Sequence, residues 1–324
     1  MLARLSTESP IAVTEWRNPT GFTVIRLQNT GTSPIRLQET HIDCLTIYAD
    51  PVLRPGQEQA FMLPFEFSIQ TSGLEIEYLL DNVPYTKSYG FDLKESCSQD
   101  VANLKGYWRA DGRGKDSSPY QRDLILHDGA TFSTFQNQPV ISTVNGGYIE
   151  LPWNASDFHT GHLALGYQYY LNEIASTQNC HFGPHDGANY LISFQSSLGG
   201  PQFSEYIIRA TNTNICRSAL FRYTETDSNS ATGGGSLLPE TTINWNFLYF
   251  SCGGFTTVDS NICTVSTLNT AFSGSPPRFY ALSESPIFLG GRPAQPDAEF
   301  DGYFRDIILF NQSKTTEELS SLFP

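Results

Sequence analysis

The stretch EFDGYFRDIILFNQSKTTEELSSLF, residues 299–323, decides the fold class of this chain. Side chains alternate along a strand, so the apolar run places Ile307 and Leu309 on one side and Ile308 and Phe310 on the other. A strand that is apolar on both sides is typical of one buried on both faces. The sequence therefore predicts a strand inside a larger β-structure close to the end of the chain.

The polar segment after this strand predicts one short helix. Thr315 and Glu318 have the spacing of a capping box, in which each side chain accepts a hydrogen bond from the other residue's backbone N–H. Leu319, Leu322 and Phe323 then form one apolar stripe at helical spacing. We expect this helix to cover one end of a sandwich, so the terminal stretch is structural.

Residues 103–324 form the second of two predicted domains. They contain many short runs of strand character separated by turn signals, and no ten-residue run with helical periodicity precedes the final segment. Many strands without alternating helices are typical of a jelly roll or a large sandwich. The polar segment 94–106 marks the boundary with the first domain.

Residues 1–98 are predicted to form a separate, immunoglobulin-like β-sandwich. The stretch GFTVIRLQNTGTSPIRLQ, residues 21–38, alternates with period two around a turn at Asn29. Further turns are expected at Pro55-Gly56 and at Asp81-Asn82, where residues that tolerate positive φ separate two strands. Five to seven short strands in fewer than 100 residues fit such a sandwich.

Two motifs at opposite ends of the second domain carry a resemblance. LKGYWRADGRGKDSSPYQRDLILHDGATF (104–132) and the terminal stretch, together with GGYIELP (146–152), resemble the laminin-G-like/pentraxin superfamily of concanavalin A-like jelly rolls. The positions that match are Tyr107, Trp108, Asp111, Gly112, Asp116, Ser117, Ser118, Phe300, Asp301, Gly302, Tyr303, Glu317, Glu318 and Leu319. The resemblance implies that the first and last strands of the domain are neighbours.

The first domain carries a second resemblance. The turns in V-x-L-x-N-T-G, L-x-P-G-Q and I-E-Y are similar to those of archaeal type IV pilin-like surface proteins. That resemblance implies a cell-surface or pilus-associated role. Such pilins polymerise through a long apolar helix at the start of the chain, and this sequence has no such run. The start of the chain also has no apolar run long enough for the core of a signal peptide, so we expect either a removed leader or anchor, or another route of export.

Composition excludes some classes of partner. The formal net charge of −14 argues against nucleic acid, because phosphate binding needs clustered Lys and Arg. No stretch approaches the ~20 apolar residues that span a membrane. Charged residues are 16% and aromatic residues 13% of the 324 residues. This composition indicates an extracellular all-β protein.

The cysteines support an oxidising compartment. There are six, none of them in a CxxC pair, so a zinc ribbon is not expected. Proximity in the sequence predicts three disulfides, and free buried thiols are the alternative. Asn154 and Asn311 begin candidate N-glycosylation sequons. The predicted pairs are Cys44–Cys97, Cys180–Cys216 and Cys252–Cys263.

Asp111, Asp116 and Asp301 form a candidate calcium site. Each aspartate lies beside Gly or Ser in a turn at a strand end, and the resemblance brings the two ends of the domain together. Carboxylate and backbone oxygens in irregular loops suit Ca²⁺. The alternative is that each aspartate only makes an Asx turn.

Five aromatic residues are candidates, by residue type, for stacking on a sugar: Trp153, Tyr167, Tyr169, Tyr170 and Trp245. If GYQYYL (166–171) is a strand, then Tyr167 and Tyr169 share one face and Tyr170 points to the other. The alternative is that these rings are core, as most aromatic residues of a sandwich are.

No catalytic residue is predicted. A retaining glycosidase needs two carboxyls about 5 Å apart, and the Glu-x-Asp-x-Glu spacing of the related β-glucanases is absent from the sequence. The sequence thus favours an extracellular lectin-like protein or adhesin that binds a glycan or glycoprotein. The first alternative is a structural surface or pilus subunit that acts by protein contacts, and the second is a glycoside hydrolase.

Overall fold

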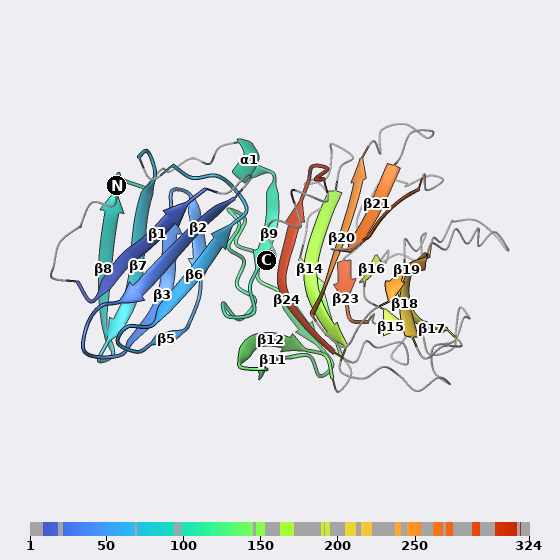
Figure 1. The fold of residues 1–324 in the computed structure, drawn as a ribbon, viewed down its shortest axis with the longest axis horizontal. Coiled ribbons are helices and arrows are strands. Elements are labelled where there is room, and N and C mark those ends of the chain that lie inside the picture. The colour runs from blue at the N-terminus through green and yellow to red at the C-terminus, as the bar shows by residue number, and fades with distance from the viewer. Residues whose placement is uncertain are drawn as a thin grey trace.

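The structure, a computed structural model, describes residues 9–18, 22–68, 70–93, 97, 99–144, 147–152, 163–171, 189–190, 192–194, 205–211, 215–221, 237–240, 245–253, 262–267, 270–274, 287–291, 302–315 and 318. Two β-sandwiches lie side by side, joined at one end by a single helical turn, α1 (Gln99–Ala102) (Figure 1). All the strand pairs described are antiparallel. The predicted all-β fold class is confirmed.

The first sandwich consists of eight strands in two sheets. One sheet has the order β1-β2-β6, and the other has the order β4-β3-β7-β8, with β5 also paired with β3. The strands are β1 (Ile11–Arg17), β2 (Thr23–Asn29), β3 (Ile35–Ile42), β4 (Leu45–Tyr48), β5 (Val52–Leu53), β6 (Glu58–Leu63), β7 (Gly73–Leu80) and β8 (Val83–Gly90).

The turns of this sandwich follow local sequence signals. Asp81 and Asn82 connect β7 to β8 with φ of 52° and 64°, the left-handed values that a two-residue hairpin turn requires. Gly56 has φ of 78° in the Pro-Gly turn before β6. The buried Asn29 side chain accepts a hydrogen bond from Gly31 N–H and donates to Leu53 O, so it ties two turns together. The three predicted turns are confirmed.

The second sandwich contains one large sheet and two smaller ones. The large sheet has the order β11-β12-β24-β14-β20-β21-β22, with β9 also paired with β24, and the smaller sheets are β10-β13-β23-β16 and β15-β17-β18-β19. The strands are β9 (Leu104–Trp108), β10 (Ile125–His127), β11 (Thr131–Phe135), β12 (Gln138–Ser142), β13 (Tyr148–Leu151), β14 (Leu163–Leu171), β15 (Asn189–Tyr190), β16 (Ile192–Phe194), β17 (Glu205–Thr211), β18 (Ile215–Phe221), β19 (Leu237–Glu240), β20 (Trp245–Gly253), β21 (Ile262–Thr267), β22 (Thr270–Gly274), β23 (Ile287–Leu289) and β24 (Gly302–Phe310).

The first and last strands of the second sandwich are neighbours, as the sequence predicts. β9 pairs with the end of β24, with Tyr107 opposite Ile308 and Trp108 opposite Ile307. Residues 307–310 are all buried, which confirms that β24 is covered on both faces. After this strand, Thr315 N–H donates to Glu318 Oε2 at 2.7 Å and Glu318 N–H donates to Thr315 Oγ1 at 3.2 Å. The capping box is therefore present.

The two faces of β24 contact different parts of the molecule. Ile308 and Phe310 belong to one continuous apolar cluster with the interior of the first sandwich, and the ring of Phe310 meets that of Phe65 edge to face at 6.1 Å. The Tyr107 hydroxyl donates to Met62 O at 2.9 Å across the same boundary. We call this the outer face of the large sheet, and part of it is covered by the first domain.

The opposite, core face of the large sheet packs against the small sheet of β10, β13, β23 and β16. A Cβ added at Gly290, which follows β23, would come within 3.1 Å of the Phe304 ring. Ile307 and Leu309 are also fully buried on this side. Tyr167 lies opposite a bulge in β24, where the pairing register shifts and Asp306 has φ of 51°. Because of the bulge, Phe304 before it and Ile307 after it both project to the core face.

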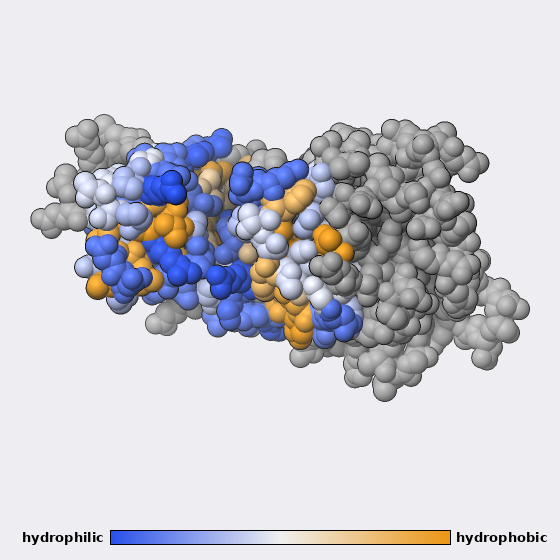
Figure 2. Space-filling model, turned by 90° about the horizontal axis from the view of Figure 1, so that it is seen from below, coloured by the Kyte–Doolittle hydropathy of each residue, from blue (hydrophilic) through white to orange (hydrophobic). Residues whose placement is uncertain are grey.

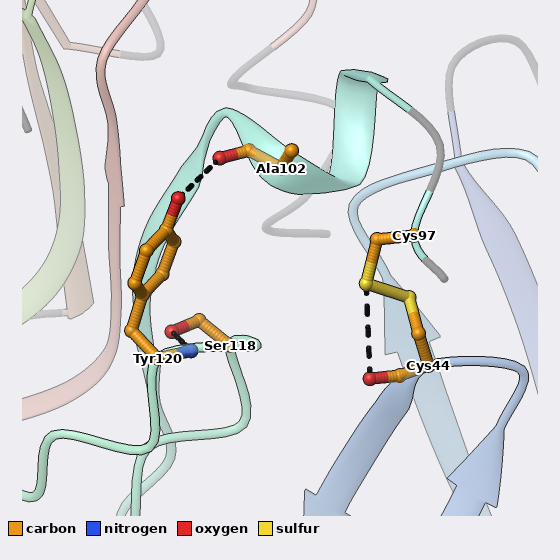
Figure 3. The surroundings of a disulfide bond; sticks show 5 residues. All are labelled: Cys44, Cys97, Ala102, Ser118 and Tyr120. Atoms are coloured by element: carbon orange, nitrogen blue, oxygen red, sulfur yellow. Dashed lines mark hydrogen bonds between the residues drawn. A yellow bond between two sulfur atoms is a disulfide. The ribbon is translucent and has the colours of Figure 1, made fainter. Parts of the chain in front are cut away.

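One disulfide links the end of the first domain to its interior. Cys44 and Cys97 are bonded, with Cα atoms 5.4 Å apart, just before α1 (Figure 3). This predicted pair is confirmed. Cys252 lies directly opposite Cys263 in the β20–β21 register, Cys216 lies in β18 and Cys180 falls outside the described residues. The other two pairs stay predictions.

Among the described residues, no helix has the length and apolar character needed to cross a membrane.

Candidate functional site

The outer face of β14, β20 and β24 carries a group of aromatic side chains. The strand register sets their position, because Tyr170 lies opposite both Trp245 on β20 and Tyr303 on β24. Residues opposite one another on neighbouring strands project to the same face. Phe135, the last residue of β11, joins them from the adjacent hairpin. We call Phe135, Tyr170, Trp245 and Tyr303 the aromatic cluster.

The rings of the cluster lie in contact without being fully buried. Phe135 stacks on Tyr303 with centroids 4.2 Å apart and an interplanar angle of 17°, and it also contacts Tyr170 at 4.7 Å. Trp245 meets Tyr170 edge to face at 5.7 Å. Tyr170 is buried beneath its neighbours, whereas Phe135, Trp245 and Tyr303 are partly exposed. The cluster therefore presents aromatic surface to solvent.

A guanidinium group extends this surface. Arg305 lies over the Trp245 ring at 4.0 Å from its centroid, a cation–π arrangement, and its Nε donates to the Gln168 side chain. Burial lowers the pKa of Arg305 from its usual range, and Asp306 opposes this shift. The Trp245 indole Nε1 is buried and has no hydrogen-bond acceptor in the part of the chain that the structure describes.

These groups suit a polar ligand that also has an apolar face. Tyr and Trp rings supply flat apolar area with a polar atom at one edge. Arg305 adds donors beside those rings, and its hydrogen bond to the buried Gln168 side chain fixes its position. Sugars offer C–H faces for the rings and hydroxyls for the donors. The arrangement can therefore hold a saccharide without any covalent step.

The candidate stacking residues of the sequence analysis separate into two groups. Tyr170 and Trp245 lie in the aromatic cluster, and Trp153 falls outside the described residues. Tyr167 and Tyr169 share one face, as the sequence predicts, but this is the core face and both are fully buried. The rings contact each other at 6.2 Å, and Tyr167 also contacts Phe304 at 5.8 Å. These two assignments to ligand binding are corrected, because the small sheet covers both rings.

The sequence analysis names Tyr170 and Trp245 of the cluster but not Phe135 or Tyr303. Tyr303 belongs to the terminal motif, which supplied a structural interpretation only, and neither Phe135 nor Arg305 was considered as a ligand contact. The pairing of β14 with the terminal strand places Tyr303 beside Tyr170. A signal was available, because the terminal strand alternates Tyr303 and Arg305 on one face against Phe304 on the other.

Asp116 is occupied within its own loop. Its two carboxylate oxygens accept four hydrogen bonds, from the backbone N–H groups of Tyr107, Ser118 and Arg122 and from the Ser118 hydroxyl, at 2.7–2.9 Å. The residue is fully buried. Burial raises the pKa of Asp116, and the four hydrogen bonds oppose that shift. This carboxylate ties the loop after β9 to the strand, as the alternative of an Asx-type turn supposes.

Asp111 is also engaged, in an ion pair at the boundary between the domains. Arg109 Nε and Nη2 donate to its two carboxylate oxygens at 2.9 and 2.6 Å. The guanidinium lies 5.4 Å from the centroid of the Phe61 ring in the first domain. Asp301 falls outside the described residues, so the calcium hypothesis stays a prediction.

The two sequons differ in what the structure describes. Asn154 falls outside the described residues. Asn311 follows β24, its backbone N–H donates to Asn103 O at 3.0 Å, and its side-chain oxygen is buried. Glycosylation at either site stays a prediction.

Comparison with solved structures gives weak matches, and none of them supports a functional assignment. Domain 4 of the extracellular arabinanase AbnA from Geobacillus stearothermophilus, solved with arabinotriose, has a TM-score of 0.48 and 11% identity and covers 68% of this chain and 98% of its own. The binding domain of botulinum neurotoxin DC, solved with rat synaptotagmin II, has a TM-score of 0.47 and 9% identity and covers 69% of this chain. Trypanosoma rangeli sialidase, solved with sialic acid, has a TM-score of 0.47 and 10% identity and covers 95% of this chain.

The chain spans 51% of the neurotoxin domain and 61% of the sialidase. No protein-family model and no curated protein matches the sequence. The class that the structure itself defines is an all-β protein of two antiparallel sandwiches with an aromatic and cationic surface on its largest sheet.

Proposed function

We propose that this protein is an extracellular glycan-binding protein and that the aromatic cluster is its binding surface. The observation that carries the proposal is the combination of three partly exposed rings with Arg305 stacked on one of them. Rings of this kind, left uncovered by the protein, provide the apolar part of a saccharide site. Arg305, held in place by the buried Gln168, provides the polar part.

The proposal is for binding without hydrolysis. Retaining hydrolysis needs two carboxyls about 5 Å apart at the scissile bond. The aromatic cluster, Gln168 and Arg305 contribute none. Cell-surface location is part of the same proposal and is supported by the disulfide between Cys44 and Cys97.

Membership of the laminin-G-like branch of jelly rolls is also proposed. The support is the pairing of the first with the last strand of the second sandwich, together with the Asp116 loop that follows the first. The proposal takes the protein to be an adhesin, with a subunit that acts only by protein contacts as the alternative. On the face shown in Figure 2, the described apolar residues occur as separate groups between hydrophilic ones.

A glycan array on the purified full chain tests the proposal. The array is run with the unchanged protein, Trp245→Ala, Tyr303→Ala and the control Phe132→Ala. Phe132 is a suitable control because it is an exposed aromatic residue, 37% accessible, on β11 and outside the cluster. Arms with calcium and with a chelator test the candidate site at Asp111, Asp116 and Asp301 in parallel.

We expect binding to be lost in Trp245→Ala and Tyr303→Ala and retained in Phe132→Ala. Equal binding by all four proteins would place the site elsewhere. The absence of any glycan ligand would favour the structural alternative, in which the partner is another protein. Loss of glycan binding in the presence of the chelator would support a calcium site at the three aspartates.

A further inference from the structure

A second group of polar side chains lies on the first domain, on the five-stranded sheet. Glu39 of β3 lies opposite Glu77 of β7, so both side chains project to the same face. His41 is two residues beyond Glu39 on β3 and therefore shares that face. The β3–β7 register shifts between Leu37 and Glu39, which places a bulge at this point. Bulges often re-aim side chains next to functional sites.

The distances within this group are too long for hydrogen bonds. His41 Nε2 is 3.5 Å from Glu39 Oε2 and 3.7 Å from Glu77 Oε1, and one ligand atom of each residue lies within 4.8 Å of the others. An N–H···O hydrogen bond measures about 2.7–3.2 Å. Two ligands of a tetrahedral Zn²⁺, each at about 2.1 Å from the metal, are about 3.4 Å apart. The His41 to carboxylate separations match the metal geometry better.

The other nitrogen of His41 is held from outside the group. Nδ1 lies 3.0 Å from the Thr46 hydroxyl on β4, and the register places Thr46 directly opposite His41. Histidines that ligate metals commonly have their second ring nitrogen fixed in this way, which sets the orientation of the ring. The contact directs Nε2 toward the two carboxylates.

The group is accessible, and among the described residues no Lys or Arg forms a salt bridge with Glu39 or Glu77. The Glu39 and Glu77 side chains are 37% and 44% exposed, whereas His41 is 19% exposed. Lys115 interacts electrostatically with Glu39, but its Nζ is paired with Asp123. An ion can therefore reach the site from solvent and keep an open coordination position.

A second histidine–carboxylate pair shows the ordinary arrangement. His127 Nε2 lies 2.8 Å from Glu150 Oε2, within hydrogen-bond distance, and the His127 ring stacks on Tyr148 at 4.6 Å. That pair is satisfied by its own hydrogen bond. His41, in contrast, is placed between two carboxylates without bonding to either.

We propose that Glu39, His41 and Glu77 bind one divalent transition-metal ion, with Zn²⁺ as the best match. One imidazole and two carboxylates are good zinc ligands, and three protein ligands with one open position are the usual set of an accessible zinc site. Calcium and magnesium fit less well, because both prefer oxygen ligands throughout. This site is separate from the aromatic cluster and does not depend on the proposed glycan binding.

Calorimetric titration of the chelator-stripped full chain with ZnCl₂ tests the proposal. The variants are Glu77→Gln, His41→Gln and Thr46→Val, with His127→Gln as the matched control. We expect one Zn²⁺ per chain, binding weakened at least tenfold in Glu77→Gln and His41→Gln, and unchanged binding in His127→Gln. Thr46→Val removes only the orienting contact and should weaken binding about 10- to 100-fold.

Cobalt substitution supplies a readout of geometry. Co²⁺ at a four-coordinate site gives an intense visible absorption, which we expect in the unchanged protein and in His127→Gln but not in Glu77→Gln. Far-ultraviolet circular dichroism checks the fold of each variant, and Glu77→Gln is the safest because its side chain is the most exposed. The proposal is overturned if Zn²⁺ does not bind, or if it binds equally well to Glu77→Gln and the unchanged chain.

Discussion

The two faces of β14 and β24 use the same kinds of residue for opposite purposes. On the core face, Tyr167 and Tyr169 are fully buried against Phe304 and the small sheet. On the outer face, Tyr303 of β24 and Trp245 of β20, which flank Tyr170, keep part of their surface exposed. The sequence of either strand shows only alternation. What covers each face decides whether a tyrosine stabilises the fold or stays available to a ligand.

The first domain covers only part of the outer face. It covers the end of β24 that contains Ile308 and Phe310, which join the interior of the first sandwich in one apolar cluster. Toward the other end of β24, Tyr303 and Arg305 lie outside that cluster. One strand thus contributes to the core, to a domain interface and to the candidate binding surface.

The largest effect is expected on the core face. Tyr167→Ala should lower the free energy of unfolding by about 3–5 kcal/mol, because truncating a buried aromatic ring leaves a cavity. Urea unfolding followed by fluorescence measures this loss. Tyr303→Ala is the matched outer-face variant and should cost clearly less. Equal losses in the two variants would show that the faces do not differ as described.

The covered part of the outer face should give an intermediate effect. Phe310→Leu keeps most of the apolar volume but removes the edge-to-face contact with Phe65. Such aromatic pairs contribute about 0.5–1.5 kcal/mol beyond their area. We expect a loss of about 1 kcal/mol in the same urea experiment. A loss that persists when Phe65 is already changed to Leu would argue against a direct contact between the two rings.

The exposed part of the outer face should affect binding and hardly affect stability. Trp245→Phe keeps an aromatic ring but removes the indole N–H, which has no acceptor among the described residues. Stability should stay within about 0.5 kcal/mol. Affinity for a glycan found on the array should fall about twofold to fivefold, because the smaller ring offers less stacking area and a weaker cation–π partner to Arg305. Unchanged affinity in a direct titration would show that the Trp245 ring does not contact the ligand.

The smallest effect concerns pH. Burial raises the pKa of Asp306 above its usual 3.8, with Arg109 opposing the shift. Because the folded state favours the protonated carboxyl, this group stabilises the fold fully at pH values below its pKa in the unfolded chain. That stabilisation is lost as the pH rises through its pKa in the folded protein. Asp306→Asn does not titrate, and Asn tolerates the positive φ at this position.

The stability of Asp306→Asn relative to the unchanged protein should thus rise between pH 4 and pH 7. The side chain is 35% exposed, so the difference should be small. Thermal unfolding of both proteins across this range measures it. A difference that falls with rising pH would mean that Arg109 and Arg305 outweigh burial at this carboxyl.

Local signals in the sequence were sufficient for the elements and the turns. Asp81-Asn82 predicts a hairpin because only a few residue types adopt positive φ, and Thr315 with Glu318 predicts a helix start because the partners are three residues apart. Residues 307–310 predict a doubly buried strand because their apolar run leaves neither side polar. Each of these inferences depends on neighbours within a few positions of the chain.

The candidate sites could not be assigned in the same way. The sequence predicts Asp116 as a calcium ligand, whereas in the structure its oxygens accept hydrogen bonds from the N–H groups of Tyr107 and Arg122. The sequence predicts Tyr167 as a ring that stacks on a sugar, whereas in the structure it is fully buried on the core face. Glu39 and Glu77 are 38 positions apart in the sequence, and only the β3–β7 register makes them opposite neighbours.

The sequence by itself therefore determined the all-β class, the turns, the Cys44–Cys97 pair and the closing of the second sandwich by its last strand. Those features follow from alternation, turn chemistry, the proximity of cysteines in the sequence and a motif resemblance, all of which can be seen in the sequence itself. Only the tertiary structure decided which aromatic residues stay exposed, which carboxylates are already bonded and which histidine stands between two glutamates. Burial and hydrogen bonding depend on what packs against a residue, and those neighbours come from distant strands.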